Sequence, residues 1–206
     1  MNGTDCLTPT AHALRRLSPS CGPVRLVAVD GHAGSGKSTF AERLAAELGG
    51  APVLRLDDLA THEELFEWTA RLEEQVLGPL SRGERARYTP YDWVARRFGP
   101  EERVVEPAPV VLVEGVGAGR RAVRPWLARL LWMDLATGTS WARGRLRDGP
   151  ELTGFWNGWE RAEARHFALD PSRPYADFLV RQFPAGYEVV NGPAVTAEDP
   201  LRRHTP

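Results

Sequence analysis

The chain has 206 residues, of which 42% are hydrophobic, and its formal net charge is −1. This length suits a single domain with a core of its own, and the balanced charge excludes a global field that would attract nucleic acid or an anionic membrane. No apolar run approaches the ~20 residues that cross a bilayer, and the first residues lack the pattern of a secretory signal, so we expect neither a nucleic-acid nor a membrane partner.

Residues 1–22 come before the first predicted strand and contain Pro9 and Pro19. We expect a peripheral N-terminal segment, with at most a short helix over residues 11–17. Cys6 and Cys21 both lie in this segment, where a disulfide would close only a short loop outside the core. We therefore expect two reduced thiols, which are typical of a cytoplasmic protein.

Residues 31–39 read Gly-His-Ala-Gly-Ser-Gly-Lys-Ser-Thr, and this order fits the phosphate-binding P-loop: Gly, four residues, then Gly-Lys-Ser/Thr. The apolar run 24–29 predicts a buried strand before the loop, and residues 40–48 predict a helix after it. A strand that passes through a glycine loop into a helix directs backbone N–H groups and the positive end of a helix dipole at one point. A polyphosphate is the natural occupant, whereas a chance Gly/Ser turn with a lysine would not explain this context.

We therefore expect this loop to bind ATP together with Mg²⁺. Lys37 should reach the β- and γ-phosphates and act in catalysis, and the Ser38 hydroxyl should ligate Mg²⁺. The residues predicted to contact the nucleotide are Gly31, Ala33, Gly34, Ser35, Gly36, Lys37, Ser38 and Thr39.

Beyond the P-loop, apolar runs alternate with helical patterns. This alternation is typical of a parallel sheet covered by helices on both faces, and ligands of such sheets bind beyond the carboxyl ends of the strands. The predicted strands cover residues 52–56, 110–113, 130–135 and 176–180, with a further short strand at 187–190, and the predicted helices cover residues 62–77, 139–147 and 159–167.

Acidic residues end three of the predicted strands: Asp30, the pair Asp57 and Asp58, and Glu114. We expect all of them to face the phosphates, where one carboxylate can hold Mg²⁺ and another can accept the proton of an attacking hydroxyl. Asp57 is the predicted base, close to both substrate and metal. Glu114 is the predicted metal or water ligand beside the substrate. Asp58 stays open as a second candidate base or as the cap of the following helix.

Three arginines, Arg143, Arg145 and Arg147, alternate along a predicted helix that ends at a break in residues 148–150. We predict a short lid over residues 148–158. Arginines at the root of a lid can close over a triphosphate and exclude water, which competes with an acceptor hydroxyl. Arg147 is the predicted catalytic arginine and Arg143 a nucleotide ligand. A solvated basic face is the alternative.

The insert over residues 58–108 is longer than a crossover between two strands requires. Its centre combines aromatic residues with one acid, Asp92. Aromatic faces stack on planar ligands, and a carboxylate accepts hydrogen bonds from sugar hydroxyls. Tyr91 and Asp92 are therefore predicted in the substrate site, with packing of Tyr91 and Trp93 inside the insert as the alternative.

The ordered set of motifs resembles the uridine kinase-like family of P-loop kinases over about residues 24–180. The resemblance implies an α/β P-loop kinase fold: a five-stranded parallel sheet flanked by helices, with a helical substrate-binding insert and a short lid. It also implies transfer of the γ-phosphate of ATP to a small-molecule hydroxyl that Asp57 activates, a nucleoside-binding segment at Tyr91 and Asp92, and Arg147 near the phosphates. The motifs that carry the resemblance are the P-loop, Asp57-Asp58, Pro90-Tyr91-Asp92, Glu114-Gly115, Arg147-Asp148 and Ala176-Asp177.

The chain departs from uridine kinases where those enzymes read the nucleoside. Leu59-Ala60 stand in place of their usual Phe-Tyr pair, and Arg96 stands near the place of a base-reading His. We keep Arg96 as a substrate-binding candidate, because the phosphate machinery is retained while the reading groups have changed. The Arg-Gly-Arg stretch that usually follows the Arg-Asp pair in the lid is also missing, because residues 149–151 read Gly-Pro-Glu.

The sequence therefore predicts a kinase domain over residues 23–190 and a loose C-terminal tail over residues 191–206. The expected activity is phosphorylation of a small-molecule alcohol, with a nucleoside-like molecule as the predicted acceptor. A kinase of a non-nucleoside alcohol and a nucleotide-binding ATPase or regulator stay open, as does a homo-oligomer. A guanine-reading Asn-Lys-x-Asp motif is missing from the sequence, which disfavours a GTPase switch.

Overall fold

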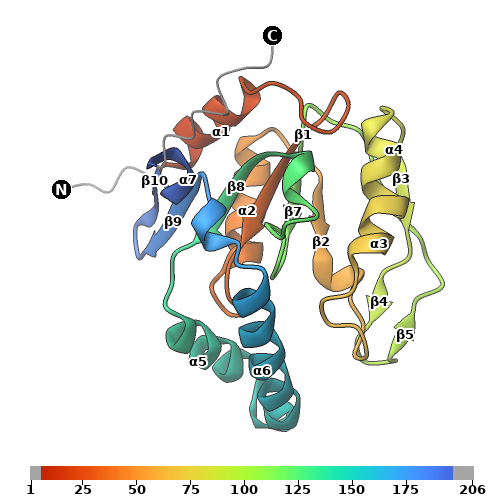
Figure 1. The fold of residues 1–206 in the computed structure, drawn as a ribbon, viewed down its shortest axis with the longest axis vertical. Helices are drawn as coiled ribbons and strands as arrows, with labels where there is room; N and C mark the ends of the chain where they lie inside the picture. The colour runs from red at the N-terminus through yellow and green to blue at the C-terminus, as the bar shows by residue number, and fades with distance from the viewer. Residues whose placement is uncertain (1–5, 197–206) are drawn as a thin grey trace.

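A computed structural model describes residues 6–196 of the chain. Its centre is a six-stranded sheet with the order β10-β9-β8-β1-β7-β2 (Figure 1). The five strands from β9 to β2 are parallel, as predicted, and β10 pairs with β9 in the antiparallel direction at the edge. The strands span Arg25–Asp30 (β1), Val53–Arg55 (β2), Val110–Glu114 (β7), Leu127–Met133 (β8), Phe178–Phe183 (β9) and Gly186–Asn191 (β10).

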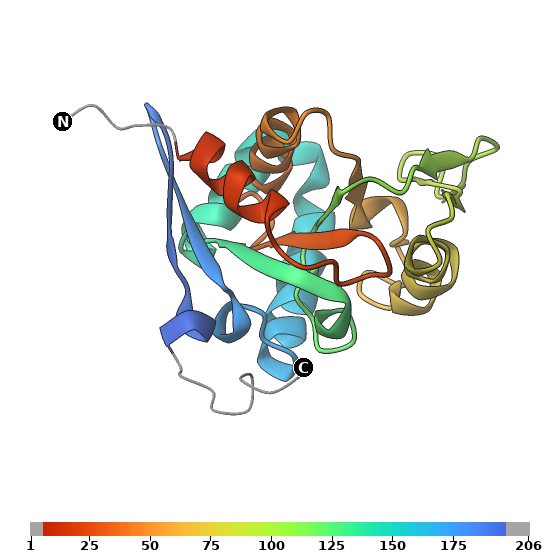
Figure 2. The same cartoon turned by 90° about the horizontal axis from the view of Figure 1, so that it is seen from above.

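The inner strands are buried on both faces, which is why they read as continuous apolar runs rather than alternating ones. In β1, Leu26 and Ala28 enter the core on one face, while Val27 and Val29 enter the core on the other. Two helices, α1 (Leu7–Arg15) and α2 (Lys37–Glu47), cover the second of these faces. Figure 2 shows both helices on one side of the sheet.

The ends of the described chain are more ordered than predicted. The N-terminal helix is α1, displaced from the predicted residues 11–17, and its buried Leu7, Ala11 and Leu14 pack in the same cluster as α2. Part of the predicted loose tail is structured too, because α7 (Pro193–Thr196) follows β10. The rest of the tail, residues 197–206, lies outside the described residues. Cys6 and Cys21 form no disulfide with each other.

The insert begins with a loop where the sequence predicted a helix over residues 62–77. The helix starts only at Thr69, with α3 (Thr69–Leu72), a π-helical turn (Glu73–Leu77) and α4 (Gly78–Ser81) in succession. Before Thr69, two carbonyl oxygens that a helix would pair with N–H groups four residues later have other donors: the Glu64 carbonyl accepts from the Thr61 N–H, and the Phe66 carbonyl accepts from the Arg120 guanidinium.

After this helical segment the insert contains four short strands, so it is not helical throughout. They are β3 (Ala86–Tyr88), β4 (Tyr91–Asp92), β5 (Arg97–Phe98) and β6 (Arg103–Val105), and they form two antiparallel pairs. The helical segment packs on the sheet face opposite to α2 through Leu72 and Val76, together with Trp68, which directly precedes it. Figures 1 and 2 both show the insert at the β2 end of the sheet.

Two helices stand beyond the carboxyl ends of the strands, below the sheet in Figure 1. They are α5 (Thr137–Asp148) and α6 (Thr153–Leu169), joined by a single 3₁₀ turn (Pro150–Leu152). The predicted lid over residues 148–158 is therefore the tip of a helical hairpin, and α6 starts six residues before the helix predicted at 159–167. No helix within residues 6–196 combines the length and the apolar character needed to cross a bilayer.

Candidate active site

The P-loop connects β1 to α2, as the motif predicted, and two of its glycines have left-handed backbone conformations. Gly34 has φ +81° and Gly36 has φ +93°. A Cβ atom on Gly34 would lie 2.0 Å from the carbonyl oxygen of Ser140 in α5. The missing side chain thus allows α5 to pack directly on the loop, which places Arg143 and Arg147 beside the loop residues.

Lys37 is the first residue of α2, and its ammonium group folds back over the loop. Nζ donates to the carbonyl oxygens of Gly31 and His32, at 3.0 Å each, and the residue is only 8% exposed. Lys37 is also the only lysine in the sequence; the other 25 basic residues are arginines. The ammonium group is therefore fixed at the mouth of the loop before any phosphate arrives.

Glu163, in the middle of α6, fixes the other side of the loop and was missed by the sequence analysis. Its fully buried carboxylate accepts a hydrogen bond from the Ala33 N–H (3.1 Å) and from the His32 ring Nδ1 (2.7 Å). It also accepts from the indole N–H groups of Trp141 (3.0 Å) and Trp159 (2.8 Å). One carboxylate thus ties the P-loop to both helices of the hairpin.

Burial alone would raise the pKa of Glu163, but the hydrogen bonds it accepts outweigh this and hold the pKa below its ordinary value. The carboxylate is therefore charged at neutral pH. Because the folded pKa is lowered, the stability that Glu163 contributes is present at neutral pH and is lost as the pH falls through that lowered pKa.

Glu163→Gln is expected to lower the free energy of unfolding by about 2–4 kcal/mol, because the amide NH₂ would face donors and leave one or two of them unpaired, at about 1–3 kcal/mol each. Urea unfolding at neutral pH measures this loss. Glu160→Gln on the same helix is the matched control: Glu160 pairs with Arg145 at a partly exposed site, where solvent screens the pair, so this variant should lose much less stability. Equal losses in the two variants would contradict the role assigned to Glu163.

A cavity of about 470 Å³ opens over the P-loop. It brings together ten predicted site residues from four parts of the chain: the loop with the start of α2, the end of β2, the end of β7 and α5. Gly31 and Ser35, also predicted as nucleotide contacts, do not line it; the Gly31 carbonyl binds Lys37, and Ser35 is 1% exposed. The lining residues are Ala33, Gly34, Gly36, Lys37, Ser38, Thr39, Asp57, Glu114, Val116, Arg143, Gly144, Leu146, Arg147 and Trp159.

Asp57 and Glu114 face this cavity from the ends of neighbouring strands. The surrounding protein raises the pKa of both carboxyls by desolvation, and the Lys37 ammonium opposes the rise in each case. The Ser38 hydroxyl hydrogen-bonds to Glu114. A hydroxyl and two carboxylates are the oxygen donors that Mg²⁺ prefers, and Mg²⁺ in proteins usually takes its remaining ligands from phosphates and water. The residues present thus fit the predicted metal.

The other two acids at strand ends do not face the cavity, which corrects the expectation that all of them would. Asp30 is fully buried and accepts the N–H groups of Gly31, Gly117 and Gly119, so it fixes the loop after β7. Asp58 turns toward the insert and accepts the Tyr88 hydroxyl at 2.9 Å and the Arg103 guanidinium at 2.6 Å. Asp58 makes no helix-capping hydrogen bond, and of the two neighbouring aspartates only Asp57 is placed to act as a base.

The two predicted arginines lie at the rim of the cavity on α5. Arg143 donates to the Gln182 side chain at 3.2 Å. Arg147 is paired with the adjacent Asp148 through two hydrogen bonds, at 2.6 and 2.9 Å, and this pairing raises the pKa of the guanidinium. Both side chains are exposed, so they can turn toward a bound triphosphate without breaking the core.

A second cavity of about 360 Å³ adjoins the first between the insert and the tip of the α5–α6 hairpin. Ala33, Asp57, Arg147 and Trp159 line both cavities, so the two spaces meet at these residues. The residues that line the second cavity are Ala33, Asp57, His62, Trp93, Val94, Arg147, Asp148, Leu152, Phe155, Trp156 and Trp159.

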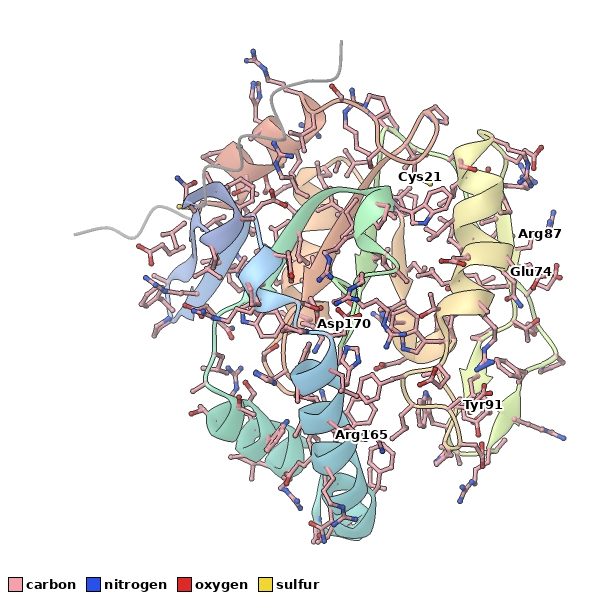
Figure 3. The ribbon with its side chains drawn as sticks, in the orientation of Figure 1. Cys21, Glu74, Arg87, Tyr91, Arg165 and Asp170 are labelled. Atoms are coloured by element: carbon pink, nitrogen blue, oxygen red, sulfur yellow. The ribbon has the colours of Figure 1, made fainter. Side chains whose placement is uncertain are left out.

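Three predicted substrate-binding residues are not among those that line either cavity. Tyr91, on β4 in the insert (Figure 3), is buried, and its hydroxyl lies 3.1 Å from Nδ1 of His62. The Asp92 carboxylate accepts the N–H groups of residues 94 and 95 and so closes the turn after β4. Arg96 occupies a left-handed conformation in that turn and pairs with Glu63 at 3.6 Å. All three shape the hairpin that carries Trp93.

No protein-family model matches the chain, and no curated protein matches its sequence. Solved structures do match it. A structure described as a possible uridine kinase from Bacillus stearothermophilus has a TM-score of 0.54 at 15% identity, covering 77% of this chain and 94% of that one. A proposed fructose transport system kinase from Silicibacter sp. TM1040 has a TM-score of 0.50 at 22% identity, covering 79% and 88%.

The chain has the fold of a P-loop kinase. A third structure, a D-glycerate 3-kinase from Cryptococcus neoformans, gives a TM-score of 0.47 at 16% identity and covers 89% of this chain and 97% of that one. At these identities the similarity establishes the P-loop kinase fold alone. The names of the first two structures refer to uridine and to a fructose transport system, and the acceptor of this chain has to be argued from its own site.

Proposed function

We propose that the protein is an ATP-dependent kinase that transfers the γ-phosphate to a hydroxyl of a small molecule, in the cytoplasm. The observation that carries this proposal is the junction of the two cavities. The phosphate-binding cavity over Lys37 and the second cavity meet at Asp57 and Arg147. A γ-phosphate gripped by the P-loop would therefore point at a space in which a second substrate can lie beside a candidate base.

The residues divide the proposed reaction in the following way. Lys37 and the loop N–H groups hold the triphosphate, and Asp57 orients the acceptor hydroxyl and takes its proton. The acceptor oxygen forms a bond to the γ-phosphorus while the bond from that phosphorus to the β-phosphate oxygen breaks, and ADP leaves with the bonding electrons. Mg²⁺ held by Ser38 and Glu114 would neutralise phosphate charge. Arg143 and Arg147 close over the phosphates and exclude water.

The position of the insert residues favours a non-nucleoside alcohol over a nucleoside. Tyr91, Asp92 and Arg96 would have to enter the second cavity to read a base or a ribose. Instead they hydrogen-bond or pair within the insert. This supports the alternative that the sequence analysis left open, a kinase of a different small-molecule alcohol.

The test of the kinase proposal is ADP release from MgATP with and without a panel of alcohols: uridine, cytidine, fructose, glycerate and simple aryl alcohols. A kinase is expected to release ADP faster with one class of acceptor, and mass spectrometry should find the phosphorylated alcohol. ADP release that no acceptor accelerates would favour an ATPase. No release and no product with any acceptor would overturn the proposal.

The single lysine makes nucleotide binding directly testable. An acyl phosphate formed on the γ-phosphate of ATP transfers its acyl group to a lysine beside that phosphate, and Lys37 is the only lysine available. We expect peptide mass spectrometry to find the label on Lys37 and excess MgATP to prevent it. Labelling of the N-terminal amine should be insensitive to MgATP. A label on Lys37 that MgATP fails to prevent would contradict the assigned phosphate site.

A further inference from the structure

The second cavity has polar groups at one end and an apolar body. Asp57 and Arg147 lie at the junction with the phosphate cavity, because they line both spaces. Asp148 is the neighbour of Arg147 and is already engaged by its guanidinium. Away from this end the walls are rings and aliphatic side chains: His62, Trp93, Val94, Leu152, Phe155, Trp156 and Trp159.

The three tryptophans that line the cavity offer it no unused indole N–H donor. Trp93 donates to the backbone carbonyl of Asp57 at 3.0 Å, Trp156 to the Asp148 carboxylate at 3.1 Å, and Trp159 to Glu163 at 2.8 Å. An indole has only this one donor and no acceptor. What these side chains present to a ligand is therefore carbon surface.

The rings also form one connected aromatic group. Phe155, on α6, contacts one ring of its own helix and one ring of the insert. Its ring centroid is 5.9 Å from that of Trp159, with the planes near parallel, and 6.0 Å from that of Trp93, with the planes near perpendicular. The His62 ring lies 4.8 Å from that of Trp93. Ring pairs at these separations leave flat faces and edges that accept a further ring in the same two geometries.

Two aliphatic side chains at the cavity are left in water. Val94, at the tip of the β4–β5 hairpin, is 96% exposed, and Leu152, in the turn between α5 and α6, is 44% exposed. They come from two segments far apart in sequence and line the same space. Covering such surface with an apolar ligand is favourable by roughly 25 cal/mol per Å².

We propose that the acceptor is an uncharged alcohol whose hydroxyl hangs from an aromatic or similarly apolar ring. This rests on the proposed kinase function and names its substrate class. The ring lies among Trp93, Phe155 and Trp159, and the hydroxyl points out of the apolar space toward Asp57. The cavity, at about 360 Å³, is at the small end of the range for ligand pockets, so one or two rings fill it.

The same walls disfavour polyols and sugar acids. Each additional hydroxyl buried against carbon surface without a partner costs about 1–3 kcal/mol. A carboxylate on the acceptor would also lie close to Asp57, which is itself desolvated and has Asp58 as a negatively charged neighbour. Both effects favour an acceptor that has few polar groups besides the reacting hydroxyl.

The test compares acceptors in the same ADP-release assay. We expect 2-phenylethanol and its ring-substituted relatives to give a kcat/KM at least tenfold above those of fructose, glycerate and uridine. If a sugar, a sugar acid or a nucleoside is phosphorylated better than every aryl alcohol, the kinase proposal stands and the apolar acceptor is wrong. If no alcohol of any class is phosphorylated, both proposals fail together, and MgATP protection of Lys37 alone would remain.

The Phe155→Ala variant tests whether the ring of the acceptor lies in the second cavity. We expect this variant to raise the KM for the aryl alcohol at least tenfold while the KM for ATP stays within twofold, because Phe155 lines only the second cavity. Phe183→Ala is the matched control: Phe183 is 52% exposed and lines neither space. Thermal unfolding of both variants verifies that they fold. An unchanged KM for the alcohol in folded Phe155→Ala would place the acceptor elsewhere.

Discussion

Lys37→Ala is expected to lower kcat/KM for ATP by at least 10³-fold, which corresponds to about 4 kcal/mol of transition-state stabilisation. Phosphoryl transfer depends mainly on positioning and on neutralising charge. Lys37 is the only lysine or arginine of the P-loop, and its ammonium group is already held by the carbonyl oxygens of Gly31 and His32. Steady-state ADP release at varied ATP concentrations, with a productive acceptor present, measures the loss.

Arg165→Ala is the control for this variant. Arg165 is an exposed cation on α6 that lines neither of the two cavities (Figure 3). It should retain activity within twofold, which would show that removing one positive charge from the surface is not enough to lower the rate. A Lys37→Ala protein that folds and keeps more than a tenth of the wild-type kcat/KM would contradict the phosphate-binding role of this lysine.

Asp57→Asn is expected to lower kcat by about 10²–10⁴-fold, the range for loss of a general base, while the affinity for ATP changes little. The amide keeps the shape of the side chain but cannot take the acceptor proton. ATP affinity is read from protection of Lys37 against acylation, which requires no turnover. Full activity in Asp57→Asn would remove the base assignment.

Asp58→Asn provides the matched control, because Asp58 binds Tyr88 and Arg103 instead of facing the cavities. The Asp58→Asn variant should keep most of the activity, but the pH dependence of its kcat/KM should shift toward lower pH. The negative charge of Asp58 contributes to raising the pKa of Asp57. Removing that charge lowers the pKa of Asp57, so the acid limb of the kcat/KM profile should move to lower pH.

The raised pKa of Asp57 also affects the stability of the folded protein. Its pKa in the folded protein is raised, first of all by desolvation, so the folded state binds the proton more tightly than the unfolded state does. The charged carboxylate is then unfavourable above the folded pKa, and stability rises as the pH falls through it. Asp57→Asn should therefore unfold at the same temperature as the wild type or higher at neutral pH, although it is inactive. A marked decrease would show that Asp57 has a structural role.

The sequence predicted most residues that line the first cavity, because the determinants of their positions are local. The P-loop is nine consecutive residues between a strand and a helix, and Asp57 and Glu114 follow strands whose carboxyl ends meet at one edge of the sheet. Asp30 and Asp58 show the limit of this argument. They also end strands, but the partners that turn them away, such as Gly117 and Tyr88, lie far along the chain.

The second cavity could not be predicted from any single stretch of sequence. The second cavity forms where an insert loop, the β4–β5 hairpin and the tip of the α5–α6 hairpin meet, and a tryptophan that lines a cavity has the same sequence pattern as one that fills a core. Asp92 was ambiguous for a similar reason, because aspartate serves equally as a ligand or as the acceptor that closes a turn. Glu163 was missed because its four hydrogen-bond donors come from the P-loop, α5 and α6 and are brought together only by the fold.

The single lysine, at the start of α2, allows the opening of the first turn of that helix to be measured. A protease that cuts only after lysine has one target bond in the whole chain, between Lys37 and Ser38. That bond lies in the first turn of a helix behind a nearly buried side chain, so cleavage has to wait until the turn unravels. The rate of cleavage after Lys37 would then measure how often the first turn of α2 opens. Its decrease in the presence of a ligand would measure how strongly that ligand suppresses the opening.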